Sequence, residues 1–406
     1  MSNIVINEKG QSRLAILEEL MNGDAVSASL VSKRTSLSPA TVSRVFKELR
    51  EKELISFRKK VQNGKGRSTG LYSFNKEYGF LLHYYVTNKA VWGYLADLKG
   101  NVLQKSYYDY NPQNTLDDFF SIIKKLKDDL SRSIETQKGE ILAAGFSIPG
   151  VVNEESRTVY TVPDARQLNN IKFFDYAERM LNVPVIANNV SWLAAVGEKT
   201  RVYPFVNSLV YIVFTNQTGI GAGIVYKNEL IKGGMHYAGE IGQTWFDQCY
   251  SFEDYVAGKG LYEHTASIQH LFNSAEVEIA AGRAPILQEL LLSPKNARLS
   301  VHLLEEAARA GDSAIVDILD KAVRVWASMI INLNMIINPE IFVLGGCLST
   351  ANQYIYGVLD SYLSKINLFK PHVQLSVSGE DSQLHGGLQV LKEYVNANII
   401  FKEALK

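Results

Sequence analysis

The sequence is poor in cysteine, with only Cys249 and Cys347 among 406 residues. Two thiols so far apart argue against a disulfide framework and against a thiolate-rich metal site. Also missing are an uninterrupted run of about 18 apolar residues that could span a bilayer and the basic-then-apolar N-terminal pattern of a secretory signal. These absences predict a cytoplasmic protein without a membrane segment, and the length predicts two or three structural units.

Net charge is missing as well, because 42 Lys and Arg balance 42 Asp and Glu. The charges are nevertheless unevenly distributed. Residues 1–75 hold thirteen basic against seven acidic side chains, a net charge of +6, which leaves 29 against 35, or −6, in the remainder. This asymmetry is typical of a small nucleic-acid-binding domain on an acidic regulatory domain, since phosphates need only local positive charge. A solvated, Lys-rich terminal helix would explain the charge equally well.

Residues 37–55 carry the strongest local pattern of this basic part. Ser38 can cap a helix that has Pro39 at its first position. An apolar stripe follows at helical spacing, formed by Val42, Val45, Phe46 and Leu49. Helices are also predicted over residues 12–21 and, with Ser27 as its cap, over residues 28–35. This order is that of a helix-turn-helix. The opposite face of the capped helix has hydroxyls and cations that suit base edges and phosphates. The DNA contacts expected there are Ser38, Thr41, Ser43, Arg44 and Lys47.

The segment after Leu54 alternates between apolar and polar residues and breaks at residues 63–67, which predicts a two-stranded hairpin with a basic, flexible tip. Lys65 and Arg67 of this tip are expected to contact DNA. Arg67 suits insertion into a narrow minor groove, where the negative potential is concentrated. The alternative is an ordinary charged loop. Taken with the helices, the hairpin predicts a winged helix-turn-helix DNA-binding domain over residues 1–75.

Residues 76–406 alternate between strand and helix patterns, which indicates α/β layers. Strands are predicted within 79–110 and over 141–146, 183–186 and 341–344, and helices over 115–136, 173–181 and 386–405. The glycine-rich TGIGAG at 218–223 lies between two predicted strands. It lacks the following helix and the acidic residue about 20 positions on that a dinucleotide-binding fold requires.

Five short motifs of this body resemble the ROK family of repressors, open reading frames and sugar kinases. In chain order they are SIPGVVN at 147–153, VPVIANNVSWLAAVGE at 183–198, TGIGAGIVYKNELIKGG at 218–234, AGEIGQ at 238–243 and INPEIFVLGG at 337–346. Each motif alone is weak, whereas five in the family's order and spacing are strong. With a helix-turn-helix in front, the chain resembles the repressor branch typified by xylose and N-acetylglucosamine repressors.

The resemblance implies a fold and a domain order. The expected fold class is α/β, with the winged helix-turn-helix followed by an actin-like, ribonuclease H-like sugar-kinase fold of two lobes. The small lobe is expected over residues 76–187, with the C-terminal helix 386–406 packing back on it. The large lobe is expected over residues 188–385, and the sugar would lie in the cleft between the lobes.

The same resemblance indicates that kinase chemistry is lost. The family's catalytic base is the Asp of a Glu-Asn-Asp-Ala stretch, which residues 187–190 match as Ala-Asn-Asn-Val. Asn189 stands at that position, and an amide cannot take a proton as a base. The family's Asp-x-Gly-Gly-Thr phosphate loop is matched by Tyr-Val-Thr-Asn-Lys at residues 85–89, without a glycine that would let backbone N–H groups approach a phosphate. We therefore expect no catalytic residue and no bound ATP.

The residues that would hold a sugar are better retained. Glu240 in AGEIGQ and Glu253 in FEDYVAGKG match the two sugar carboxylates of the family, although both could be ordinary surface charges. Gln243 replaces a family His, and the three zinc-binding cysteines are reduced to Cys249, so we expect no zinc. The predicted sugar contacts are Asn188, Asn189, Glu240, Gln243, Glu253 and, as a weaker candidate, Asp164.

These features predict a sugar-responsive repressor of a carbohydrate uptake or catabolism operon. Its expected partners are double-stranded operator DNA, a sugar or sugar phosphate and further copies of itself, as a homodimer or homotetramer, and no membrane. Sugar binding would close the lobes, change the separation of two DNA-binding heads and lower operator affinity. Three alternatives stay open: a sugar kinase that retains a DNA-binding domain, an activator that needs sugar, and a repressor tuned by a phosphotransferase protein.

Overall fold

The computed structural model describes residues 8–62, 68–111, 113–135, 139–163, 165–215, 219–247, 249–293, 298–350, 353–366 and 369–406. The chain divides into two compact units. Unit 1 consists of residues 1–146, 164–187 and 388–406, and unit 2 consists of residues 147–163 and 188–387. The segment 147–163, which the sequence assigned to a small lobe, therefore belongs with unit 2.

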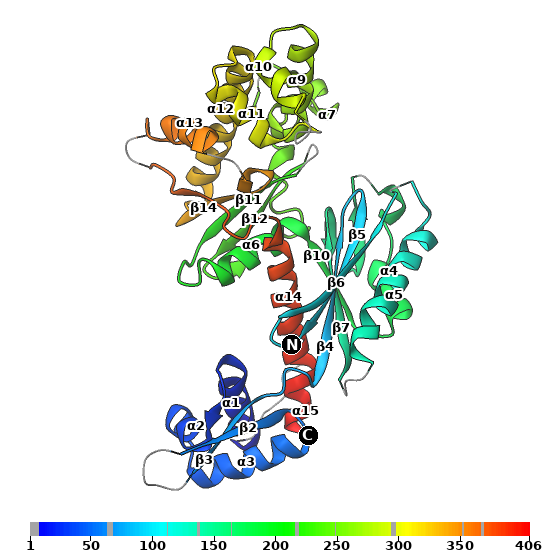
Figure 1. The fold of residues 1–406 in the computed structure, drawn as a ribbon, viewed down its shortest axis with the longest axis vertical. Coiled ribbons are helices and arrows are strands. Elements are labelled where there is room, and N and C mark those ends of the chain that lie inside the picture. The colour runs from blue at the N-terminus through cyan, green and yellow to red at the C-terminus, as the bar shows by residue number, and fades with distance from the viewer. Residues whose placement is uncertain are drawn as a thin grey trace. The chain divides into compact units, whose positions relative to one another are not determined.

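Unit 1 begins with three helices and a small antiparallel sheet of strand order β1-β3-β2 (Figure 1). Its elements are α1 (Glu8–Asn22), β1 (Val26–Ser27), α2 (Ala28–Thr35), α3 (Pro39–Glu51), β2 (Ile55–Val61) and β3 (Thr69–Phe74). The hydroxyl of Ser27 accepts a hydrogen bond from the backbone N–H of Leu30, and that of Ser38 from the N–H of Thr41. Both caps are the predicted ones, and the helix-turn-helix and hairpin elements are confirmed.

The rest of unit 1 is built on a five-stranded sheet of order β10-β7-β4-β5-β6, with two helices packed against it (Figure 1). Its elements are β4 (Gly79–Val86), β5 (Ala90–Asp97), β6 (Val102–Asp109), α4 (Leu116–Ser131), η1 (Arg132–Ile134), β7 (Glu140–Ile148), η2 (Arg166–Leu168), α5 (Phe173–Leu181) and β10 (Val185–Asn189). Aromatic rings fill the layer between sheet and helices: Phe146 stacks on Tyr84 and meets Phe173 edge to face, with ring centroids 4.7 and 5.0 Å away.

The sequence predicted one regular helix at the C-terminus. The C-terminal segment consists instead of α14 (Ser382–Val395), a π-helical turn η6 (Asn396–Ile400) and α15 (Phe401–Leu405). The last turn meets the N-terminal helices within unit 1. The Arg13 guanidinium donates to the backbone oxygen of Leu405 at 2.9 Å, and the Lys52 ammonium donates to that of Glu403 at 2.6 Å. Cationic side chains thus satisfy carbonyl groups that a helix end leaves without an intrahelical partner.

Unit 2 contains a second five-stranded sheet, of order β13-β12-β11-β14-β15, and the β8-β9 hairpin. The strands are β8 (Val151–Asn153), β9 (Thr158–Thr161), β11 (Leu209–Phe214), β12 (Ile220–Tyr226), β13 (Glu229–Leu230), β14 (Ile341–Gly346) and β15 (Val373–Leu375). The α-helices are α6 (Val190–Arg201), α7 (Phe252–Val256), α8 (Tyr262–Ala266), α9 (Ile268–Ala280), α10 (Pro285–Leu291), α11 (Val301–Arg309), α12 (Ser313–Ile337) and α13 (Gln353–Leu363). The 3-10 turns are η3 (Ile241–Gln243), η4 (Cys347–Thr350) and η5 (Gly379–Asp381).

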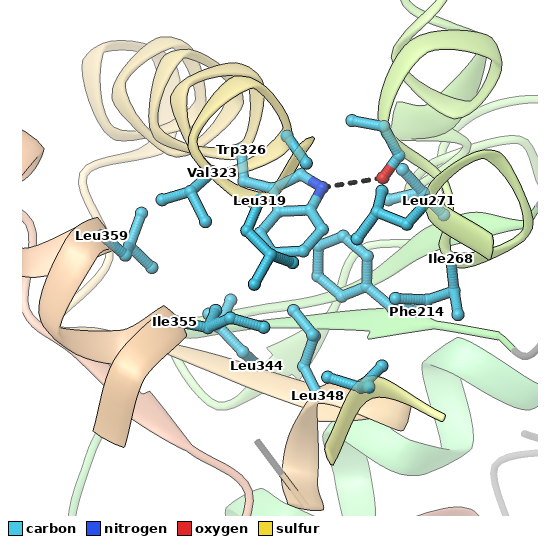
Figure 2. Packing of buried hydrophobic residues seen from close by; sticks show 14 of the residues in the cluster. Phe214, Ile268, Leu271, Leu319, Val323, Trp326, Leu344, Leu348, Ile355 and Leu359 are labelled. Atoms are coloured by element: carbon cyan, nitrogen blue, oxygen red, sulfur yellow. Dashed lines mark hydrogen bonds between the residues drawn. The ribbon is translucent and has the colours of Figure 1, made fainter. Parts of the chain in front are cut away.

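The core of unit 2 lies between this sheet and its helices. Trp326 of α12 is fully buried and meets Phe214 of β11 edge to face, with the ring centroids 5.0 Å apart (Figure 2). The indole N–H donates to the backbone oxygen of Ala266 at 2.8 Å, which satisfies the polar atom of this buried ring. Among the helices that the structure describes, none is long and apolar enough to cross a membrane.

Candidate functional site

Asn189 lies at the junction of β10 and α6 and is nearly buried, with 8% of its surface exposed. Its Oδ1 caps α6 by accepting from the backbone N–H of Ser191 at 2.7 Å, and its Nδ2 donates to the backbone oxygen of Gly150 at 2.8 Å. Both ends of the amide are therefore used by the fold. A carboxylate could keep the cap but could not donate to Gly150, so the geometry is specific for an amide.

Its neighbour Asn188 takes part in a polar group that the sequence reasoning missed. The Nδ2 of Asn188 donates to Oε1 of Glu154 at 2.9 Å, and the other oxygen of Glu154 pairs with the ammonium of Lys232. The side chains of Glu154 and Lys232 are each about one-third exposed, at 34% and 35%. Asn188, Glu154 and Lys232 are called the Glu154 cluster below. Glu154 directly follows SIPGVVN and Lys232 ends NELIK, so their nearness to two motifs was the available signal.

A second polar group forms around Glu240, at the start of η3. Burial raises the pKa of Glu240, and the charge of Glu263 on α8 raises it further. Burial also raises the pKa of Glu263, whose carboxylate accepts a hydrogen bond from the side-chain amide of Gln243. Glu240, Gln243 and Glu263 are called the Glu240 cluster below. Two half-buried carboxylates that lie close together lower the stability of the folded state when both are ionised, and such pairs are common at functional sites.

Glu263, not Glu253, is the carboxylate that the structure brings to Glu240. Glu253 lies on α7 with its side chain exposed. The sequence reasoning chose it because FEDYVAGKG resembles the family motif that carries the second sugar carboxylate. The missed signal was the apolar pair Leu261 and Tyr262 directly before Glu263, because both are buried and fix the first turn of α8. Asp164, Lys65 and Arg67, the other predicted contacts, lie outside the described residues.

The backbone before Glu240 is held tightly against β12. The N–H of Ala222 donates to the oxygen of Gly239 at 2.7 Å, and a Cβ on Gly239 would meet the oxygen of Ala222 at 1.9 Å. The φ of Gly239 is +94°, so a side chain is excluded on both grounds. Trp192 of α6 fixes the same segment by donating from Nε1 to the oxygen of Ala238 at 2.9 Å. These hydrogen bonds fix the backbone directly before Glu240.

The turn at residues 85–89, where a phosphate loop was considered, is a tight hairpin instead. The hydroxyl of Thr87 accepts from the backbone N–H groups of Lys89 and Ala90 at 3.2 and 2.9 Å, and donates to the oxygen of Ala90 at 2.8 Å. These N–H groups are satisfied within the turn by a side chain. They are therefore not available as a group of free donors for a bound phosphate.

Cys249, the one cysteine at the place where the resemblance implied a zinc loop, is exposed. A hydrogen bond to Asp247 raises the pKa of the Cys249 thiol, and a protonated thiol is a poor metal ligand. Within the described ranges, no group of three or more His, Cys, Asp or Glu is arranged to hold a metal ion.

The predicted DNA-contact face lies on α3 in unit 1. Ser38, Ser43, Arg44 and Lys47 are exposed, whereas Thr41 is partly buried and shares a 2.9 Å hydrogen bond with the Ser38 hydroxyl. Arg44 pairs with Glu48 at 2.6 Å, and Lys47 is 3.9 Å from Glu51.

A single carboxylate holds two cations at the base of this face. Glu48 accepts from both Arg13 and Arg44. Burial works in the opposite direction, but the two guanidinium groups hold the pKa of Glu48 below its usual value. Because these side chains are not deeply buried, the two ion pairs contribute little to stability.

A family model described as the ROK family matches residues 88–393. The chain belongs to the ROK family. The xylose repressor of Caldicellulosiruptor bescii is 26% identical to it over 352 residues, which cover 82% of each chain. The xylose repressor of Staphylococcus xylosus is 24% identical, with 98% of each chain covered.

Among solved structures, a ROK family transcriptional regulator described as a homolog of the E. coli MLC protein covers 98% of this chain and 99% of its own, with a TM-score of 0.75 and 20% identity. Two glucokinases match a smaller part of this chain: 74% for the glucokinase of Thermotoga maritima and 78% for a ROK family glucokinase from Streptomyces griseus. The predicted fold, a winged helix-turn-helix with an actin-like, two-lobed sugar-kinase fold, is confirmed by these structures.

Proposed function

We propose that this ROK protein is a sugar-responsive, DNA-binding repressor of a carbohydrate uptake or catabolism operon, and that it carries out no phosphoryl transfer. The observation that carries the proposal is the combination, in one chain, of a capped basic helix in unit 1 with the half-buried Glu240 cluster in unit 2. The full-length similarity to proteins named xylose repressors supports it. Such a protein works in the cytoplasm, where its operator DNA is.

Two features support the proposed absence of kinase activity. Asn189 stands where a kinase of the family has its base, and both ends of its amide are engaged. The hydroxyl of Thr87 accepts hydrogen bonds from the backbone N–H groups of Lys89 and Ala90, and a phosphate loop would need such groups free to bind phosphate. Because the two features lie in separate places, a small movement of the chain would not restore both requirements of phosphoryl transfer.

The charges of unit 2 favour a neutral effector sugar over a sugar phosphate. Glu154, Glu240 and Glu263 carry the acidic groups of the two clusters, and the one cation in them, Lys232, already pairs with Glu154. A phosphate dianion brought among these carboxylates would meet net repulsion at short range. Sugar hydroxyls, in contrast, donate to carboxylates and accept from the Asn188 and Gln243 amides. Because two similar proteins are named xylose repressors, xylose is the first sugar to test.

Regulation follows from linkage between two sites. The protein is proposed to have two forms that differ in operator affinity. A sugar that binds the low-affinity form more tightly than the other form shifts the population toward the low-affinity form, and DNA is released. Helix-turn-helix proteins gain affinity by reading two half-sites about one helical turn apart, so we propose that a homodimer is the minimal DNA-binding form. We further propose that no structural zinc is needed, which metal analysis of the purified protein checks.

The proposal is tested by fluorescence anisotropy of labelled DNA from the region upstream of the gene, titrated with protein at fixed salt. Xylose, arabinose, ribose, glucose and their phosphates are then added. One neutral sugar is expected to weaken DNA binding at least about tenfold, a coupling of ordinary size, while its phosphate has no effect. DNA binding that no sugar or sugar phosphate alters would overturn the proposal.

The second candidate, a sugar kinase with a DNA-binding domain, is favoured by the match to glucokinases of the family. It predicts formation of ADP from ATP that depends on an added sugar. The same protein preparation and the same sugar panel decide between the two functions.

A further inference from the structure

His236 has a backbone conformation that histidine rarely adopts. Its φ is +61°, in the left-handed region where a Cβ crowds the following carbonyl group. The side chain is nevertheless 91% buried, with 9% exposed, whereas its neighbours Met235 and Tyr237 are 73% and 48% exposed. A strained residue on an exposed loop thus has its ring inside the protein.

One nitrogen of the His236 ring also lacks a hydrogen-bond partner. This nitrogen, Nδ1, is completely buried and has no partner among the described residues. A neutral imidazole has one nitrogen that donates and one that accepts, and buried polar atoms without partners are rare. Backbone strain combined with an unmet hydrogen bond is typical of a ligand site. At a position with only a structural role, a different residue would avoid both energetic costs.

The position of His236 connects the two polar clusters of unit 2. It lies on the segment 232–240, which begins at Lys232 of the Glu154 cluster and ends at Glu240 of the Glu240 cluster. The segment closes on itself, since the N–H of Ala238 donates to the oxygen of Lys232 at 3.2 Å and that of His236 to the oxygen of Gly233 at 3.3 Å.

The ring of His236 lies near the start of α6. Its centroid is 6.2 Å from that of Trp192, with the ring planes 36° apart. Trp192 holds the segment from the other side by donating to Ala238, and Asn188 and Asn189 precede it in the chain. The imidazole therefore lies beside the helix whose start follows Asn188 and Asn189, two of the residues proposed to hold the sugar.

We propose that His236 is a specificity-determining residue of the sugar site, and that its imidazole hydrogen-bonds one hydroxyl of the effector. The inference rests on the proposed function and deepens it. A hydroxyl both donates and accepts, so it satisfies a ring nitrogen of His236 in either tautomer. A site with such a group rejects an analogue that lacks the hydroxyl, because the buried nitrogen is again unpaired.

The test uses the full-length protein and two substitutions. His236→Gly removes the imidazole and suits a φ of +61°. His236→Asn keeps a polar side chain and tolerates the same backbone. Lys227→Gly is the control, because Lys227 also has a positive φ, +53°, but lies in the exposed β12–β13 turn. Sugar affinity is measured by calorimetry for xylose, arabinose, ribose and glucose, together with the melting temperature and DNA affinity without sugar.

His236→Gly is expected to raise the Kd of the preferred sugar at least about tenfold and to reduce the preference between sugars that differ at one hydroxyl. Its melting temperature and DNA affinity should stay at or above the wild-type values. His236→Asn should give an intermediate Kd, and Lys227→Gly a wild-type one. Wild-type sugar affinity and selectivity in both His236 variants would overturn the assignment while leaving the proposed function intact. A wild-type protein that binds no sugar of the panel would overturn both.

Discussion

The hydroxyl of Ser382, at the start of α14, donates to the fully buried carboxylate of Glu198 on α6 over 3.0 Å. The same carboxylate accepts from the backbone N–H of Val377 at 2.9 Å and from the Ser376 hydroxyl at 3.2 Å. Beside this network the two helices nearly touch, because a Cβ on Gly386 would meet the oxygen of Leu193 at 1.7 Å. Within unit 2, α6 is thus fixed at both ends, by Glu198 at its C-terminal end and by the Asn189 cap at its start.

Gly386→Ala should destabilise the protein, because the added methyl group would force α6 and α14 apart. We expect a loss of about 1–3 kcal/mol, the usual cost of overpacking a rigid core. Urea denaturation measures it. Gly357→Ala on α13 is the matched control, since nothing lies within 4 Å of a Cβ there. Equal stability of the two variants would show that α6 and α14 pack less closely than described.

Glu240→Gln should stabilise the sugar-free protein at neutral pH and weaken sugar binding. Burial raises the pKa of Glu240 in the folded state, so its ionised form costs stability. The cost is absent below the unfolded pKa, near 4.5, grows as pH rises toward the raised folded value and is complete above it.

The stabilisation from Glu240→Gln should therefore be about 1 kcal/mol at pH 7 and vanish near pH 4. Denaturation at both pH values, with sugar titration at pH 7, checks both effects. Glu253→Gln is the control, because Glu253 is exposed and its variant should match the wild type in each assay. A Glu240→Gln protein of unchanged stability and sugar affinity would contradict the role given to Glu240.

Asn189→Asp should not create a sugar kinase. The carboxylate would keep the cap on Ser191 but would place an acceptor against the oxygen of Gly150, where Nδ2 now donates. We expect a loss of about 1–3 kcal/mol, as for a buried acceptor left without a donor. Thermal melting and a coupled ADP assay over the sugar panel measure the two outcomes. Sugar-dependent ADP release in this variant would revive the kinase alternative.

Arg44→Ala should lower operator affinity and reduce the slope of log K against log salt by about 1, as expected for a lost phosphate contact. If Arg44 reads a base instead, specificity falls while the slope is unchanged. Glu48 keeps its bond to Arg13 in the variant, so the helix should stay folded. Lys321→Ala, an exposed lysine of α12, removes the same charge and should have no effect.

Lys52→Met should loosen the contact between the C-terminal turn and the DNA-binding head, because the oxygen of Glu403 loses a 2.6 Å charged donor. A local loss of about 1–2 kcal/mol is expected. Hydrogen exchange of α1 and α15 amides should speed up accordingly, with α12 unchanged. Identical exchange in wild type and variant would mean that this contact does not hold the head.

Local features of the sequence were enough to predict most of the elements. Ser27 and Ser38 cap their helices as expected, because capping depends on residues three positions apart. The helix over 173–181 has the predicted bounds, since its apolar periodicity is strong. The π-helical turn at 396–400 was missed, because nothing in its composition separates it from the helix on either side.

The candidate site was predicted less well, because its contacts join distant segments. Glu154 and Lys232 are 78 residues apart and meet only in the folded chain. Glu263 was passed over for Glu253, since a loop of altered length removed the spacing that identifies the second carboxylate. The backbone strain and the burial of His236 are visible in three dimensions alone.

The central claim, that one chain couples sugar to DNA, is tested most directly by reciprocity. The Kd of the preferred neutral sugar is measured by calorimetry with and without saturating operator DNA. Linkage requires that DNA weaken sugar binding by the same factor by which sugar weakens DNA binding. The account predicts a rise in sugar Kd of at least about tenfold on operator, equal to that factor. The same sugar Kd with and without operator would contradict it.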